Sequence, residues 1–88
     1  MKRFSIAKKI ADYLVSNDLV ENVSVKEIDI VLKRRGWWKE WTRLSCGAYI
    51  LSGHYEVDID LIGDGSNGYH IFSATTGDFV RYEEPFLF

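Results

Sequence analysis

The hydrophobic period of this 88-residue chain changes near residue 54, and the change limits what the chain can fold into. Before this point apolar residues recur every three or four positions, which is the period of an amphipathic helix. From His54 the segment HYEVDIDLI alternates between apolar and acidic residues. Alternation is the pattern of a strand with one buried face. A helical half followed by a strand half predicts an α+β fold.

The first predicted helix runs from about residue 5 to residue 17. Ser5 is a suitable N-cap, because its side-chain oxygen can accept a hydrogen bond from the first turn. Ile6, Ile10 and Leu14 recur at helical spacing and form the expected inward face.

The second predicted helix has clear signals at both ends. Ser24 and Glu27 match a capping box, in which each side chain bonds the other residue's backbone amide. Lys33 to Arg35 fall in the last turn, where cations offset the negative end of the helix dipole. Gly36 then supplies the residue expected just past the helix end.

A short third helix is predicted over residues 38–45. Trp41, Leu44 and Ala48 follow a spacing of three or four, which favours a helix. The apolar segment AYIL after Gly47 fits either a strand or the end of this helix.

Three strands are predicted in the second half: HYEVDIDLI, YHIFSA and FVRYEE, separated by the turn sequences GDGSNG and TTGD. In the first strand, one face should carry Tyr55, Val57, Ile59 and Leu61. The predicted architecture is two to three N-terminal helices packed on a C-terminal three-stranded antiparallel β-meander. It forms a single domain over residues 1–88, with a helical half of about 5–45 and a β half of about 54–84.

Charge is distributed unevenly between the halves. Residues 1–45 carry ten Lys and Arg against six Asp and Glu, whereas residues 46–88 carry Arg81 alone against seven acids. This asymmetry suggests two faces with different partners or a dipolar domain, although runs of charge are also usual on solvated faces. Cys46 is the only cysteine, so no intrachain disulfide can form, and no apolar run is long enough for a signal or membrane segment. We therefore expect a cytoplasmic protein.

The segment KRRGWWKEWTR, residues 33–43, holds all three tryptophans and five of the eleven basic residues. Interleaved cations and aromatics are enriched where proteins bind partners. Helix capping also accounts for the basic residues, but adjacent tryptophans cannot both face inward from a regular helix. The predicted partner-binding residues are Arg34, Arg35, Trp37, Trp38, Lys39 and Arg43.

The acids Glu56, Asp58 and Asp60 should share the other face of the first strand and form a second candidate surface. Such a face could hold a divalent metal, but alternating acids more often mark the wet side of a sheet. A cross-strand pair of Asp60 with His70 is also expected. The string G-x-G-x-x-G at residues 63–68 lies in a hairpin turn, which is the wrong context for nucleotide binding. We expect no catalytic residues, metal, cofactor or small-molecule substrate.

Two functions remain open. The first is a small non-enzymatic protein that acts through a protein–protein interface. In size and type it is similar to phage-encoded inhibitors of host nucleic-acid-handling complexes, such as the anti-CRISPR proteins. The alternative is a DNA-binding regulator, because two helices, a third helix and a hairpin over residues 5–73 look like a winged helix-turn-helix in arrangement. The acidic hairpin and the sequence pI of about 5.6 argue against DNA as the partner.

Overall fold

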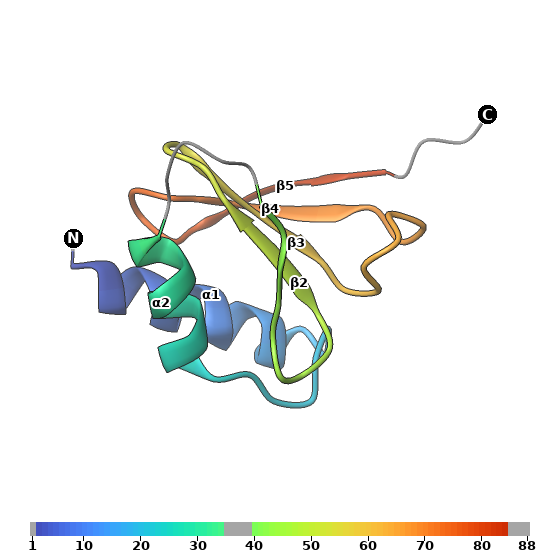
Figure 1. Cartoon of the computed structure of the whole chain (residues 1–88), viewed down its shortest axis with the longest axis horizontal. Helices are drawn as coiled ribbons and strands as arrows, with labels where there is room; N and C mark the ends of the chain where they lie inside the picture. Colours follow the sequence, from blue (N-terminus) through green and yellow to red (C-terminus); the bar gives the residue numbers. More distant parts are fainter. Residues whose placement is uncertain (1, 35–39, 85–88) are drawn as a thin grey trace.

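Two helices form one layer and an antiparallel sheet forms the other (Figure 1). The structure is a computed structural model that describes residues 2–34 and 40–84. Its elements are α1 (Arg3–Ser16), α2 (Val25–Lys33), β1 (Thr42–Arg43), β2 (Tyr49–Ser52), β3 (Glu56–Asp60), β4 (Tyr69–Ser73) and β5 (Phe79–Glu83). The α+β class predicted from the change of hydrophobic period is therefore confirmed.

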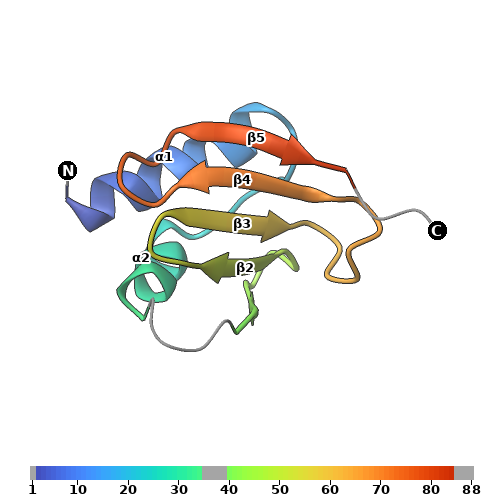
Figure 2. The same ribbon diagram turned by 90° about the horizontal axis from the view of Figure 1, so that it is seen from above.

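The strand order in the sheet is the order in the chain, β1-β2-β3-β4-β5, and each neighbouring pair is antiparallel (Figure 2). The three predicted strands correspond to β3, β4 and β5. The prediction of a three-stranded meander was two strands short, because β1 and β2 come from a region where helical and strand patterns overlap.

α1 begins at Arg3, two residues before the predicted start. Its N-cap is Lys2, which makes no side-chain capping bond, and Ser5 lies inside the helix. A tertiary contact joins this end of α1 to α2, since Arg3 Nε donates to Asp29 Oδ1 at 2.8 Å. The predicted inward face is confirmed, because Ile6, Ile10 and Leu14 are all buried.

α2 begins as predicted, with the Ser24 side chain accepting a hydrogen bond of 3.2 Å from the Glu27 amide. The other half of the capping box is absent. Instead the Glu27 carboxylate accepts bonds from the Ser45 amide at 3.1 Å and the Ser45 hydroxyl at 2.8 Å. Glu27 thus fastens the start of α2 to the turn that follows β1.

The prediction of a third helix is wrong over residues 40–45, which form an extended segment and a turn. Residues 38 and 39 lie outside the described residues. Leu44 and Ala48 are both buried because the turn brings them together: the Leu44 amide donates to the Ala48 carbonyl at 2.8 Å. The spacing of Leu44 and Ala48, which resembles that of a helix, is therefore due to a tight turn of the chain. Tyr49–Ser52 forms a strand, and the recognition helix of a winged helix-turn-helix is not present at residues 40–45.

The core lies between the helices and one face of the sheet. Its largest fully buried side chains include Phe72, Ile10 and Leu14, which come from both layers. Tyr13 of α1 stacks on Phe79 with ring centroids 4.8 Å apart and meets Phe72 edge-on at 5.2 Å. Among the described residues, neither helix has the length and apolar character needed to cross a membrane.

Candidate functional site: the open face of the sheet

Both helices lie behind the sheet in Figure 2, so the face toward the viewer is covered by no described helix. Alternation along the strands decides which side chains belong to this face. Ile50, Val57, Ile59 and Phe72 belong to the core cluster, and their strand neighbours therefore point away from the helices. The residues of this surface, called the open face below, are Trp41, Arg43, Tyr49, Leu51, Glu56, Asp58, Asp60, Tyr69, Ile71, Arg81 and Glu83.

A row of four side chains crosses the open face. Leu51 pairs with Asp58, Asp58 with Ile71, and Ile71 with Arg81 on four successive strands. Ile71 is only 2% exposed, although it stands outside the core cluster. Its neighbours across the strands must shield it, so the centre of this face is closely packed and Ile71 itself is covered.

Arg81 organises the charges beside this row. Its guanidinium bonds Glu56 through both terminal nitrogens, and its Nε bonds Glu83 at 3.1 Å. The hydrogen bond from Arg81 holds the pKa of Glu56 below its usual value, and the two carboxylates raise the pKa of Arg81. The only base of the acidic half therefore pairs with two of the acids on the open face and offsets one of their two negative charges.

Three aromatic side chains gather where the open face meets the β3–β4 loop. Trp41 is 39% exposed and stacks on Tyr69, with ring centroids 5.7 Å apart and planes inclined by 26°. The Tyr49 ring lies so close to Gly63 that a Cβ on the glycine would stand 2.2 Å from the ring. The loop thus supports the aromatic cluster from one side.

Asp60 does not contribute an exposed charge to the open face. It is 4% exposed, and its carboxylate accepts hydrogen bonds from the amides of Ile62, Gly63 and Gly65 at 2.8 to 3.2 Å. Successive backbone N–H groups of this kind form an anion-binding concavity. The glycine-rich string of this loop, which resembles a phosphate-binding motif in spacing, therefore encloses the chain's own carboxylate.

The predicted cross-strand partner of His70 was wrong by one position, since Ile59 and not Asp60 stands opposite His70. His70 consequently lies on the helix side of the sheet, with its ring 4.9 Å from Tyr82 and 6.2 Å from Phe79. Burial lowers its pKa. Among residues 2–34 and 40–84, no group of three or more His, Cys, Asp or Glu is placed to hold a metal ion.

The predicted partner-binding residues fall on separate elements. Arg34 is the exposed C-cap of α2, and Arg43 is exposed on β1 opposite Tyr49, where it belongs to the open face. Arg35, Trp37, Trp38 and Lys39 lie outside the described residues. In the second predicted surface, Glu56 is ion-paired, Asp58 lies in the central row, and Asp60 is buried in the loop.

Sequence reasoning missed two features of this face. Trp41 was placed in a helix by its spacing from Leu44 and Ala48, whereas it is exposed on an extended segment. Arg81 was not singled out, although it is the only base among residues 46–88 and seven acids surround it in the sequence. A lone cation in an acidic half is a usable signal, because it is expected to form ion pairs.

Comparisons with protein-family models, with curated proteins and with solved structures find no match for this chain.

Proposed function

We propose that this chain is a non-enzymatic binding protein that acts through a protein–protein interface, and that the open face is its binding surface. The observation that carries the proposal is the exposed stack of Trp41 on Tyr69. Tryptophan, tyrosine and arginine are the residues most enriched among binding hot spots. All three types occur on this face, with Arg43 two residues after Trp41 in the same segment.

The surroundings of the stack also suit a protein partner. The partly exposed Leu51 and the stack of Trp41 on Tyr69 supply apolar surface, and Arg81 with its two carboxylates forms a polar border. An apolar middle with a charged rim is the usual composition of a protein interface. Aromatic and Arg side chains also line surfaces for single-stranded nucleic acids, but Glu56, Asp58 and Glu83 on the same face would repel a phosphate backbone.

A narrower proposal concerns the partner. We propose a host protein that handles nucleic acid, with this chain as an inhibitor of the phage type, because strand-spaced acids could occupy a groove built for phosphates. The support for this class is smaller than for protein binding in general, since Arg81 offsets one of the two charges of Glu56 and Glu83.

The test compares two exposed aromatic residues at opposite ends of the sheet. Trp41→Ala should weaken binding to a captured and purified partner by about 30-fold, which is the effect of losing a hot spot. Tyr55→Ala is the matched control, because Tyr55 is 81% exposed in the β2–β3 turn, away from the stack. It should bind within about twofold of the parent chain. Far-ultraviolet circular dichroism confirms that both variants fold.

Two results would refute the proposal. Equal partner affinities of Trp41→Ala and the parent chain would remove the open face as the binding surface. Tight binding to mixed duplex DNA that weakens steeply with salt would favour the DNA-binding alternative, because displaced counterions give that dependence.

A further inference from the structure

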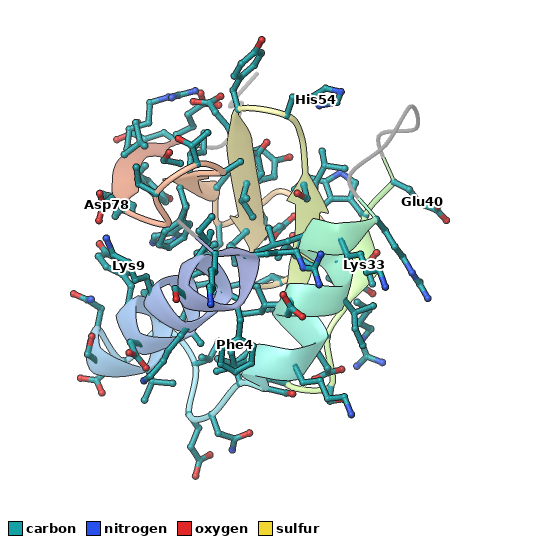
Figure 3. All side chains as sticks on the ribbon, turned by 90° about the vertical axis from the view of Figure 1, so that its left-hand side faces the viewer. Phe4, Lys9, Lys33, Glu40, His54 and Asp78 are labelled. Atoms are coloured by element: carbon teal, nitrogen blue, oxygen red, sulfur yellow. The ribbon has the colours of Figure 1, made fainter. Side chains whose placement is uncertain are left out.

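A half-enclosed cavity of about 470 Å³ lies at the end of the sheet away from the glycine loop. Its walls come from the start of α1, the end of α2, the end of β2 and the turn after β4. The volume lies within the range of small-molecule sites, which extends from about 300 to 1,000 Å³. Figure 3 views the molecule from this end, where α1 begins and Lys33 marks the end of α2.

Two cations line the cavity, and its described lining includes no carboxylate. Arg3 uses its Nε for Asp29, and among the described residues no acceptor bonds its two terminal nitrogens. Lys33 makes no ion pair with any described residue. Lys9 provides a contrast in Figure 3, because it points toward Asp78 and forms an ion pair with it. The charge of Lys33 is therefore left available among the described residues, while Arg3, which is paired with Asp29, still offers its two terminal nitrogens as donors.

Ser52 adds an independent observation. The residue lines the cavity and is only 9% exposed, and its hydroxyl is buried without a hydrogen-bond partner. A buried hydroxyl without a partner carries a free-energy cost, so such groups are uncommon in folded proteins. No hydrogen bond holds this hydroxyl in place, so a bond to a molecule in the cavity would replace none.

Two helix ends of opposite polarity meet at this site: the positive end of α1, and the negative end of α2, which Lys33 offsets. Arg3 is the first residue of the 14-residue α1, and it lines the cavity. The helix has no side-chain cap at Lys2 and no acidic residue in its first turn. An anion near this end would interact favourably with unpaired amides and with the dipole.

We propose that the cavity binds a small molecule carrying a phosphate or carboxylate group. The anionic oxygens would lie between Arg3 and Lys33 and accept a hydrogen bond from Ser52. The compact apolar part of the molecule would pack against Ile6, Leu32 and Ala74, which form the apolar part of the wall. The site is separate from the open face, and its test needs no protein partner.

The experiment is a titration followed by amide chemical shifts at constant ionic strength. Phenyl phosphate and benzoate serve as probes of the two anion types. For at least one probe we expect saturating shifts centred on Ser52, Ala74 and Thr75. Lys33→Gln should weaken that binding by about fivefold or more, because it removes a charge-assisted contact. Ser52→Ala should weaken it by about twofold to fivefold.

Lys26→Gln is the matched control, because Lys26 is an exposed lysine of α2 that does not line the cavity. Its affinity should stay within about twofold of the parent chain. Saturation by one probe alone identifies the anion type, and saturation by both shows that either group is accepted. The proposal is overturned if neither probe saturates, or if Lys26→Gln and Lys33→Gln weaken binding equally.

Discussion

At one end of the sheet, three backbone N–H groups surround a carboxylate that belongs to the chain itself. At the other end, two cations and a serine hydroxyl border a cavity that no described carboxylate lines. We call these the loop end, built around Asp60, and the cavity end, built around Ser52. Both collect groups that favour an anion. At the loop end the chain's own carboxylate satisfies them, whereas at the cavity end the Ser52 hydroxyl has no partner and Lys33 forms no ion pair with a described residue.

The loop end should therefore depend strongly on its internal anion. Asp60→Ala leaves three amide donors without their acceptor, and we expect a loss of about 3 kcal/mol in the free energy of unfolding. Asp60→Asn keeps one acceptor oxygen and should lose less. Urea denaturation of the variants measures both effects.

Asp64→Asn is the control for charge in the same loop, because Asp64 is exposed and its carboxylate bonds the Ser66 amide. Its effect should be much smaller than that of Asp60→Ala. If the two aspartates contributed equally, the loop would be stabilised by general charge and not by an enclosed carboxylate.

The next largest effect concerns the support that the loop gives to the aromatic cluster. Gly63→Ala combines a positive φ of 95° with a Cβ position 2.2 Å from the Tyr49 ring, and we expect a cost of about 2 kcal/mol in the free energy of unfolding. Gly47 has nearly the same φ, 98°, but no atom lies within 4 Å of the position that a Cβ would occupy there. Gly47→Ala thus measures backbone strain alone.

Thermal unfolding of both glycine variants separates strain from packing. Gly63→Ala should be the less stable of the two, and the difference reports the contact with Tyr49. Equal losses would mean that the ring moves aside freely and that the loop does not hold the cluster in place.

A substitution at the cavity end should change the free energy of unfolding in the opposite direction. Without ligand, Ser52→Ala removes a buried hydroxyl that has no partner, so the free energy of unfolding should be unchanged or should rise by up to about 1 kcal/mol. Chemical denaturation in a buffer free of phosphate and carboxylate measures this change. A loss as large as that of Asp60→Ala would show that the hydroxyl has a structural role, and the contrast between the two ends would disappear.

The smallest expected effect concerns His70. It tests whether a buried polar atom without a hydrogen-bond partner always marks a ligand site. His70 Nδ1 is also buried without a partner, but aromatic rings surround it and it does not line the cavity. Burial lowers the pKa of folded His70, so the unfolded chain binds the proton more readily. Stability should be unaffected above the unfolded value of about 6.5 and should fall as the pH decreases below it.

His70→Phe should flatten this pH dependence between about pH 7.5 and 5.5. His54→Asn should retain it, because His54 is exposed in the β2–β3 turn. Glu56, Asp64 and Asp78 also have lowered pKa values, but their contributions are lost at lower pH, below the ordinary carboxylate values of 4.5 and 3.8. An unchanged slope in His70→Phe would contradict the assignment.

The sequence predicted those parts of the fold that depend on a regular period. The apolar face of α1, the Ser24 cap and strands β3 to β5 follow from spacing within a single element. The structure of residues 40–52 could not be predicted from a regular period. Leu44 and Ala48 have helical spacing, yet a turn brings them together, and the bonds from Ser45 to Glu27 join residues 18 positions apart.

The same reason limited prediction of the sites. The stack of Trp41 on Tyr69 and the bonds of Arg81 to Glu56 join residues on different strands, so their geometry depends on the register of the sheet. The cavity combines residues from four elements and has no motif in the sequence. Asp60 illustrates a different error. The alternating acids of its strand predicted an exposed carboxylate, but the loop encloses this carboxylate.

The order of the strands also has a kinetic consequence. Each strand pairs with its neighbour in the chain, and α1 and α2 are consecutive as well, so most pairings close only short loops. Folding rates rise as the sequence separation between contacting residues falls. The meander can grow one hairpin at a time, while the contacts of α1 with Phe72 and Phe79 join distant parts of the chain. Docking of α1 onto β4 and β5 is therefore the step with the largest entropic cost, and substitutions at Tyr13 should slow folding more than substitutions within a hairpin.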